Sequence, residues 1–410
     1  RQYSSDINPN FYQSPYRTNP LIKYSPSGQY ILTANNDGSK PQILHTTNMN
    51  IVSTLAEQTD VVHDVIFSSD DKYILTVSEK NEEQTSEETS IKLWNIDGNL
   101  IKNIANFDYD KNGNLNSFAI SNDGNLVAVG DTNGRVTVWN KNSNLNSKIS
   151  EHEHSIDNII FSHNTNKIAI IDSQGITSVW DEQLKLVSKI NAGALINKDH
   201  QKYHNNFDNK YKVVFVKNEK QLLIANPTNI GLWDTNGKLH WSVDIDTLDY
   251  SEIDVSDNHF LVIACTQRGK GMSVGSLATC YNSLAQLWDF NGNLISSLDS
   301  RTEGEDIVEY AKFNFQGNRI ITIHKDEAMR LWDNQGNFIL KLEGKGASGD
   351  FHPDGTRLAT VDKSGELKIY EIWSDLESMI NEARRRAGRN LTEKECQDYL
   401  HQDNCRKTSD

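Results

Sequence analysis

Short apolar runs separated by polar turns follow one another along most of the chain. Eight times such a run ends in Trp-Asp or in a degenerate form of that pair. The clear copies lie at 93–95, 138–140, 179–181, 232–234, 287–289 and 331–333, and the degenerate copies at 43–45 and 369–371. A unit that recurs about every 40–50 residues indicates a closed array of repeats, above all a β-propeller.

Each unit shows the same internal order of strands and turns. In the first unit an apolar run at 22–24 leads into the turn Ser25-Pro26-Ser27-Gly28, and a second run follows at 30–33. In the last unit the turn is Pro353-Asp354-Gly355, a sequence that favours a tight reversal between antiparallel strands. We therefore predict an all-β fold, an eight-bladed β-propeller, with seven blades as the alternative if the first unit is not a full sheet.

The repeats divide the chain into three parts. Residues 21–372 carry the repeats without a linker, and the eighth unit lacks a fourth strand because the sequence turns helical at Trp373. An open last blade would leave an exposed edge, so we expect part of residues 1–20 to supply its outer strand. Residues 373–410 predict a short helical tail packed on the propeller, with Leu376, Met379, Ile380 and Ala383 on one face of a helix over 374–386.

The Trp-ended units resemble the WD-repeat family over about residues 21–372. The Gly-His signature of that family survives only as Glu151-His152, and the acidic partner expected in that unit is Gln174, so we expect its buried hydrogen-bond network to be incomplete. Only the seventh unit keeps an aspartate at that place, Asp326, where Gly304 takes the histidine position. The resemblance implies structural roles for Trp94, Trp139, His152, Trp180, Trp233, Trp288, Trp332, Asp326 and Tyr370.

A second resemblance lies in the tail. Residues 387–392, followed by Glu395-Cys396 and Tyr399-Leu400-His401, are similar to the segment that closes many cyanobacterial multidomain signalling proteins. In those proteins a propeller follows a NACHT-type NTPase of the STAND class, a caspase-like module or a related effector. The resemblance implies a C-terminal sensor whose partner is an effector module of the same chain or complex. The first residue, Arg1, is not methionine, which is consistent with a piece of a longer polypeptide.

Charge and cysteine content exclude several classes of partner. The formal net charge is −15 and the pI about 5.3, which argues against general nucleic-acid binding and against docking on an anionic membrane. No apolar stretch approaches the ~18 residues of a membrane span, and no signal peptide is visible. Four cysteines in 410 residues do not form a disulfide framework, so we expect a cytoplasmic protein.

Three units carry long insertions, at 79–90, about 191–210, and 266–283. In WD-repeat geometry all three map to the top face of the ring, and insertions on one face often mark the binding face. The residues we expect to contact a protein ligand are Glu82, Glu83, His200, Tyr203, His204, Phe207, Arg268, Lys270 and Met272. Cys265 and Cys280 flank the third insertion and could face each other as thiols.

Other readings of these segments are weaker. His200 and His204 have a metal-ligand spacing only on a helix and with further ligands, and Gly269-Lys270-Gly271 lacks the Ser/Thr and the helix of a P-loop. Cys396, His401 and Cys405 lack an evident fourth zinc ligand. Arg384 to Arg386 and Arg389 either complement a helix C-terminus or dock on an acidic surface of the effector. We therefore predict no metal and no cofactor.

The sequence offers no catalytic constellation. It contains no Gly-x-Ser-x-Gly or His-Glu-x-x-His run, and inner strands such as 159–161 and 213–215 are mainly apolar. The function predicted is therefore non-catalytic recognition of a protein ligand through top-face loops, within a larger signalling or defence protein. The alternatives are a free-standing scaffold that tethers several proteins and, less favoured, an enzyme with a site in the channel.

Overall fold

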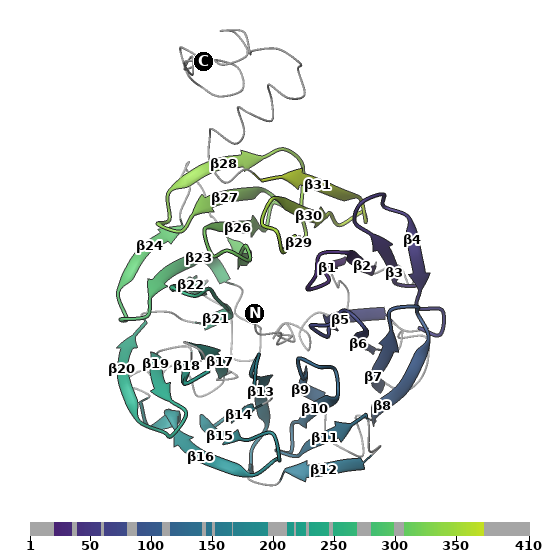
Figure 1. Cartoon of the computed structure of the whole chain (residues 1–410). Helices are drawn as coiled ribbons and strands as arrows, with labels where there is room; N and C mark the ends of the chain where they lie inside the picture. Colours follow the sequence, from purple (N-terminus) through teal and green to yellow (C-terminus); the bar gives the residue numbers. More distant parts are fainter. Residues whose placement is uncertain are drawn as a thin grey trace, which may run out of the picture.

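The computed structural model shows a ring of eight β-sheets around a central axis (Figure 1). It describes residues 20–372 apart from 35–38, 59–60, 80–87, 109–114, 142–144, 150–151, 166, 196–210, 217–218, 227–228, 246–248, 269–279 and 299–306. We number the blades from one to eight in chain order.

The strands of the first four blades have the following bounds. Blade one contains β1 (Leu21–Tyr24), β2 (Tyr30–Ala34), β3 (Gln42–His45) and β4 (Ile51–Thr54). Blade two contains β5 (Val61–Phe67), β6 (Tyr73–Glu79), β7 (Glu88–Asn95) and β8 (Leu100–Asp108). Blade three contains β9 (Leu115–Ile120), β10 (Leu126–Asp131), β11 (Val136–Asn140) and β12 (Leu145–Ile149). Blade four contains β13 (Ile156–Phe161), β14 (Ile168–Asp172), β15 (Ile176–Trp180) and β16 (Leu186–Asn191).

The 3-10 turn η2 (Ala192–Leu195) follows blade four. Blade five contains β17 (Lys212–Val216), β18 (Gln221–Asn226), β19 (Asn229–Asp234) and β20 (Leu239–Asp244). Blade six contains β21 (Asp249–Val255), β22 (His259–Arg268), β23 (Cys280–Asp289) and β24 (Leu294–Leu298). Blade seven contains β25 (Val308–Phe313), β26 (Arg319–His324), β27 (Met329–Asp333) and β28 (Phe338–Leu342). Blade eight contains β29 (Ser348–Phe351), β30 (Arg357–Val361) and β31 (Leu367–Glu371).

Every blade is an antiparallel meander whose first strand lies nearest the axis and whose last strand lies at the rim (Figure 1). The first unit forms a full four-stranded sheet, β1 to β4. The prediction of eight blades is therefore confirmed, and the seven-bladed alternative is wrong. The ring closes where β1 of blade one packs against β29 of blade eight.

In six of the eight units a tryptophan lies where it joins two blades. Trp94 lies near the end of the third strand of blade two, yet it packs in a hydrophobic cluster with Leu32 and Ile43 of blade one. Trp139 of blade three likewise packs with Leu75 of blade two. Because each sheet covers only one side of its neighbour, a large apolar side chain at a fixed place in every unit fills the wedge between sheets. This packing explains why the repeat signal is strongest at the tryptophans.

The two ends of the chain leave part of the predicted organisation open. The sheet of blade eight has three strands within the described residues. Residues 1–19, which we expect to contribute its outer strand, and residues 373–410, which we expect to form the helical tail, lie outside the described residues. Closure of the last blade by residues 1–20 therefore stays a prediction.

Candidate functional site

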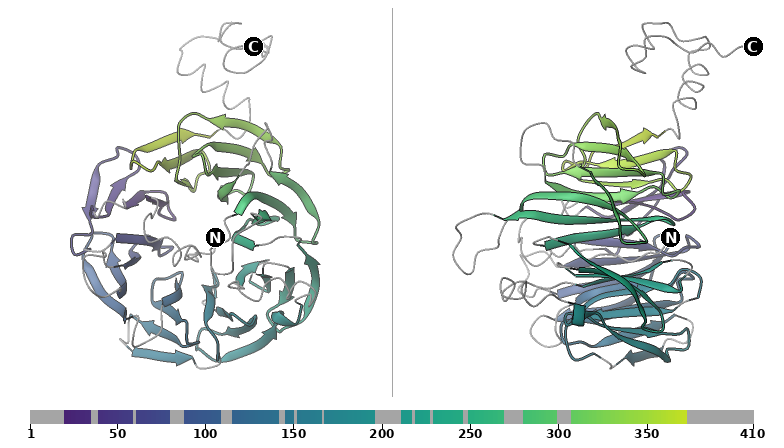
Figure 2. Two further views of the ribbon diagram at one scale, coloured as in Figure 1. Left: turned by 180° about the vertical axis from the view of Figure 1, so that it is seen from behind. Right: turned by 90° about the vertical axis from the view of Figure 1, so that its left-hand side faces the viewer.

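The three insertions leave the ring on one side. Because all blades are antiparallel meanders, the turn between the second and third strands lies on the same side as the connection to the next blade. The first insertion joins β6 to β7, the second joins β16 to β17, and the third joins β22 to β23. We call this side the insertion face. In Figure 2, β22 and β23 extend beyond the rest of the ring on one side.

A direct contact supports this assignment in blade four. The backbone of Gly175, in the turn between β14 and β15, lies close to Gly193 in η2 and to the ring of Tyr211, just before β17. The second-to-third-strand turn and the connection between blades therefore meet on the insertion face.

Most residues proposed to contact the ligand lie outside the described residues: Glu82, Glu83, His200, Tyr203, His204, Phe207, Lys270 and Met272. Arg268 is the last residue of β22, and its backbone is paired with Cys280 of β23. The structure thus places the bases of the three insertions together on one side, while the contact residues themselves stay predictions.

Cys265 and Cys280 are not opposite each other, contrary to the suggestion from the sequence that they could face each other as thiols. In the β22–β23 ladder, Cys265 is opposite Ser283 and Cys280 is opposite Arg268. The register shifts twice between these two pairs, on either side of Gln267. The two shifts cancel, so the bulge does not cause the mismatch: Cys280 is opposite Arg268, three positions beyond Cys265.

The buried network around His152 is complete, contrary to the sequence-based expectation. His152 Nδ1 lies 3.0 Å from Asp172 Oδ2, and His152 Nε2 lies 2.7 Å from Ser178 Oγ. Trp180 Nε1 donates to the same Ser178 oxygen at 2.8 Å. Ser178 can then donate its own proton to Nε2, which leaves the Nδ1 proton for Asp172, so every group in the chain of bonds has a partner.

The acidic partner of His152 is Asp172, not the residue at position 174. The acidic position is the last residue of β14, whereas Gln174 lies in the turn after that strand. Asp172 is the last residue of β14 and is opposite Ile156, the first residue of β13. Its Oδ1 accepts the backbone N–H groups of Gln174 and Ile176 at 3.0 and 2.9 Å. Asp131 of blade three occupies the matching place, opposite Leu115. The expected position, 174, lies two residues after the actual one, 172, and for this reason the sequence analysis did not identify the network.

In blade seven, Asp326 also lies two residues after the position that corresponds to Asp172. The residue that matches Asp172 there is His324, opposite Val308. His324 Nε2 lies 3.0 Å from Thr322 Oγ1, and Trp332 Nε1 donates to that hydroxyl at 2.9 Å. Asp326 instead accepts the backbone N–H of Ala328 in the turn. The expectation that Asp326 belongs to the buried network is therefore wrong.

The other residues predicted to have structural roles are also placed within the ring. Trp94 Nε1 donates to Thr76 in blade two, as Trp332 does to Thr322. Trp139, Trp233 and Trp288 are buried between sheets as expected. Tyr370 is partly buried, and its hydroxyl donates to the carbonyl of Glu343 in the neighbouring blade at 2.6 Å. The degenerate eighth copy thus contacts blade seven through its hydroxyl.

The order Asp172–His152–Ser178 resembles a hydrolytic triad in its chain of hydrogen bonds. Ser178 is fully buried, however, and its oxygen already accepts the indole proton of Trp180. A nucleophile must reach a substrate atom at about 3 Å, which this serine cannot do. The geometry therefore assigns these residues to stability.

The opposite side of the ring, which we call the turn face, carries the turns between the first and second strands. Consecutive turns contact each other through polar groups at five of the junctions between blades. These contacts are Ser25 and Ser27 with Asp71, Ser69 with Asn122, Asn164 and Thr165 with Glu219, Gln316 with Pro353, and His352 with Gly28. They link the inner parts of neighbouring blades, whose strands do not pair with each other.

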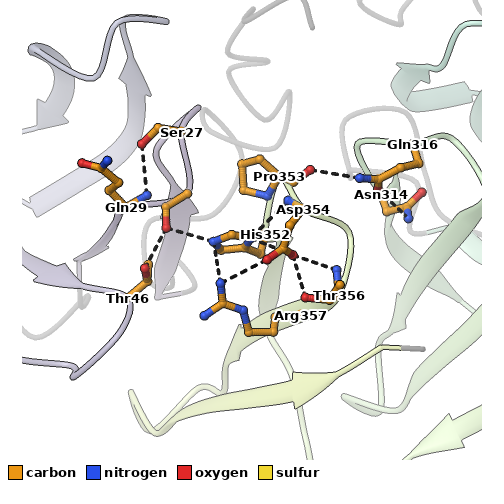
Figure 3. Close-up of polar contacts among 11 residues, drawn as sticks. Ser27, Gln29, Thr46, Asn314, Gln316, His352, Pro353, Asp354, Thr356 and Arg357 are labelled. Carbon is orange, nitrogen blue, oxygen red and sulfur yellow. Dashed lines mark hydrogen bonds and ion pairs between the residues drawn. The ribbon is translucent and has the colours of Figure 1, made fainter. Parts of the chain in front are cut away.

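Figure 3 shows the junction that joins the last blade to the first. His352 Nε2 lies 2.9 Å from the carbonyl oxygen of Gly28 and 2.8 Å from Arg357 Nη2. Asp354 lies 2.8 Å from His352 Nδ1 and 3.2 Å from Arg357. Gly28 has a φ of +77°, which favours glycine, and a Cβ atom there would overlap the His352 ring. Both the backbone conformation and the available space therefore require glycine.

Acid should weaken this junction through Asp354. Burial acts to raise the pKa of Asp354, but hydrogen bonds from Thr356 and the neighbouring His352 outweigh it and lower the pKa from 3.8 to about 2. A carboxyl group with a lowered pKa stabilises the fold above pH 4, and this contribution disappears as the pH falls through 2. We expect the urea midpoint to fall between pH 4 and pH 2, and Asp354→Asn to make that fall shallower.

The matched control is Asp257→Asn, at an exposed aspartate in the corresponding turn of blade six. We expect this change to leave the dependence of the urea midpoint on pH unaltered. An equal slope in the wild type and in Asp354→Asn would contradict the role given to Asp354.

The described residues lack two features of other classes of function. They hold no group of three or more His, Cys, Asp or Glu side chains arranged to bind a metal ion. They also contain no helix of sufficient length and apolar character to span a membrane.

Comparison with family models gives two matches. Residues 102–140 match the WD domain, G-beta repeat, and residues 3–109 match the eukaryotic translation initiation factor eIF2A family. The first match spans β11 and its Trp139, the unit that the tryptophan pattern identified. No curated protein matches the chain.

Solved structures match over the whole ring. The C-terminal WD40 domain of Sif2 has a TM-score of 0.62 at 14% identity, covering 91% of this chain and 99% of that one. The computationally designed Ika8 protein has a TM-score of 0.62 at 14% identity, covering 87% and 97%. The Dos1 propeller has a TM-score of 0.59 at 16% identity, covering 89% and 96%.

These findings support a WD40-repeat β-propeller. At 14% to 16% identity these solved structures show the fold alone, and they do not indicate what the loops of this chain bind. WD40 propellers are typically protein-interaction domains, which agrees with the class of function predicted from the sequence.

Proposed function

We propose that this WD40 propeller is a non-catalytic protein-recognition domain that binds a protein ligand through its insertion face. The observation that supports the proposal is the common side of the three insertions at the strand ends of blades two, four and six. A rigid ring that presents several long loops on one side suits the large, shallow surface of a protein ligand.

The chemistry of the insertions fits such a surface. The first is rich in glutamate, the second carries His200, Tyr203, His204 and Phe207, and the third carries Arg268, Lys270 and Met272. Aromatic, arginine and methionine side chains are enriched where protein interfaces gain most of their binding energy. Charges of both signs around them would select the partner and its orientation.

We also propose that the ring is the sensor of a larger signalling or defence protein in the cytoplasm. The tail sequence at 387–401 supports this role, and four cysteines in 410 residues are consistent with a reducing compartment. Ligand binding would change how the propeller packs on an effector module. The reading frame upstream of Arg1 tests this part: an NTPase, protease, TIR or nuclease module supports it, and a start codon directly upstream favours the scaffold.

Removing the insertions should abolish ligand binding without unfolding the ring. The variant replaces 80–87 and 269–279 by two-residue Asn-Gly turns and 197–210 by a Gly-Ser segment of equal length. Partners captured from an extract of the source cells on the immobilised chain are measured by quantitative mass spectrometry. We expect the amount of captured partner to fall about tenfold or more, since loss of a few anchoring side chains removes most of the binding energy.

A matched control changes the turn face instead. Lys72, Lys220 and Asp257 are exposed there, and their joint replacement by alanine should leave capture unchanged. Thermal unfolding verifies that both variants stay folded. Equal capture by the wild type and the insertion variant would contradict the assignment of the insertion face.

A further inference from the structure

The junction between the last and the first blade holds one nitrogen atom with two incompatible partners. His352 Nε2 lies 2.9 Å from the carbonyl oxygen of Gly28 and 2.8 Å from Arg357 Nη2 (Figure 3). A carbonyl oxygen only accepts hydrogen bonds, and a guanidinium group only donates them. Nε2 donates when it carries a proton and accepts when it does not. The bond to Gly28 and the bond to Arg357 therefore exclude each other.

The other ring nitrogen keeps its proton in both cases. His352 Nδ1 lies 2.8 Å from Asp354 Oδ1 and 3.1 Å from the backbone nitrogen of the same residue. A bond donated to a carboxylate is stronger than one accepted from a neutral amide. The pKa of Asp354 is lowered to about 2, so the carboxylate is ionised at neutral and mildly acidic pH. Nε2 is therefore the atom that gains or loses a proton.

Both competing partners of Nε2 have a second bond. The carbonyl oxygen of Gly28 also accepts the hydroxyl of Thr46 at 2.7 Å. Arg357 Nη2 also lies 3.2 Å from Asp354 Oδ2. Because each partner keeps this second bond, neither arrangement leaves a buried polar group unsatisfied. Such a contact can change from one arrangement to the other when a single proton is added.

We infer that protonation of His352 Nε2 switches the closure of the ring between two bonding arrangements. In the neutral state Arg357 donates to Nε2. In the cationic state Nε2 donates to the carbonyl of Gly28, and repulsion between like charges moves Arg357 away from the ring nitrogen to Asp354 alone. The bond from an imidazolium group is charge-assisted, so mild acid joins blade eight more tightly to blade one.

The neighbouring groups keep their charge while His352 titrates. Tyr24 of blade one packs edge-on against the imidazole, with ring centroids 5.0 Å apart, and burial raises the pKa of Tyr24, so its hydroxyl stays neutral. Asp350 is bound to Lys312 of blade seven, and Asp71 of blade two bonds to the serines of the first-blade turn. Carboxyl and ammonium groups ordinarily titrate outside pH 5 to 8, whereas imidazole titrates within it.

Nuclear magnetic resonance of the full chain with isotope-labelled histidine measures which ring nitrogen carries a proton. The signals of His352 are identified by their absence from His352→Gln. We expect a proton on Nδ1 alone at pH 8 and protons on both nitrogens at pH 5. A proton on Nε2 at both pH values, or at neither, would overturn the inference.

Crystal structures of the full chain at the same two pH values locate the guanidinium group. At pH 8, Arg357 Nη2 should lie about 3 Å from His352 Nε2. At pH 5, the carbonyl of Gly28 should be the partner of Nε2, with Arg357 bound only to Asp354. The proposal fails if Arg357 stays beside Nε2 at pH 5.

Hydrogen exchange in the turn 25–28 measures the effect on the ring closure. After correction for the intrinsic effect of pH, with the turn 121–124 of blade three as reference, exchange should be about fivefold slower at pH 5 than at pH 8. His352→Gln cannot change charge and should remove this difference. His154→Gln, at an exposed histidine on the insertion face, should keep it. Equal corrected rates at the two pH values in the wild type, or an unaltered difference in His352→Gln, would contradict the switch.

Discussion

Replacing Asp172 with alanine is expected to lower the free energy of unfolding by about 3 kcal/mol, because one buried and two part-buried donors lose their acceptor together. These donors are His152 Nδ1 and the backbone N–H groups of Gln174 and Ile176, at 2.9 to 3.0 Å. Asp172 is itself buried, so water cannot replace the lost bonds without opening the blade. Urea unfolding followed by intrinsic tryptophan fluorescence measures the change.

The loss of stability in the Asp172→Ala chain should be largest in blade four and in the two blades beside it. Stability in stacked repeats is approximately a sum of terms for each unit and for each contact between neighbours. Hydrogen exchange in the Asp172→Ala chain should therefore accelerate most in β13 to β16 and in the blades on either side. Uniform acceleration around the ring would show that the blades unfold as a single unit.

Asp181→Ala is the matched control in the same blade. Asp181 also accepts two backbone N–H groups, those of Gln183 and Lys185, in a turn that is open to solvent. Water can replace these bonds, so we expect a loss of about 1 kcal/mol or less. Equal losses for the two variants would contradict a buried network around His152.

The strands and the blade count were predictable because one physical requirement recurs in every unit. Each sheet must bury both of its faces against neighbours, and Trp94, Trp139 and Trp332 fill that space at the same place in their units. A requirement repeated eight times is visible in a single sequence even where individual copies, such as 43–45, are degenerate.

The polar contacts were harder to predict because they depend on single registers. In blade four, the acidic partner of His152 was expected at position 174 but lies at 172, because the sequence alone does not show which of these residues ends the strand. Cys265 and Cys280 do not meet because the register of the ladder puts Cys280 opposite Arg268, three positions beyond Cys265. In both cases a difference of two or three positions changes which side chains meet, while the apolar pattern stays the same.

The contacts across the ring closure could not be predicted from periodicity at all. They join residues more than 320 positions apart, such as Gly28 with His352 and Tyr24 with Asp350. The second contact has a counterpart in Phe313 with Asp254, but one further copy does not make a repeat that the sequence pattern reveals. One indirect signal exists: a ring whose inner strands do not pair must satisfy their facing N–H groups with side-chain acceptors. Asp157 and Asp254 do this for Tyr211 and Phe313.

Asp350 performs this role at the closure of the ring, and Asp350→Ala should open it. Asp350 Oδ2 accepts the backbone N–H of Tyr24 in blade one at 2.8 Å, and Oδ1 lies 2.6 Å from Lys312 Nζ in blade seven. One carboxylate thus joins three blades. Its side chain and that of Lys312 are only 8% and 19% exposed, so removal leaves a poorly hydrated ammonium group and a buried amide. We expect a loss of about 3 kcal/mol in the free energy of unfolding.

The location of the loss distinguishes a closure contact from an ordinary buried ion pair. Hydrogen exchange should accelerate in β1, β25 and β29 and stay unchanged in blades three to five, which are far from the closure. Asp362→Ala removes an aspartate from the same blade that bonds only within its own turn, through Ser364 and Glu366, and should cost about 1 kcal/mol or less. If exchange in β1 is unaffected by Asp350→Ala, the role given to Asp350 is contradicted, and blade one is held to blade eight by the packing of Ile22, Ile31 and Val361 and by the contact of His352 with Gly28.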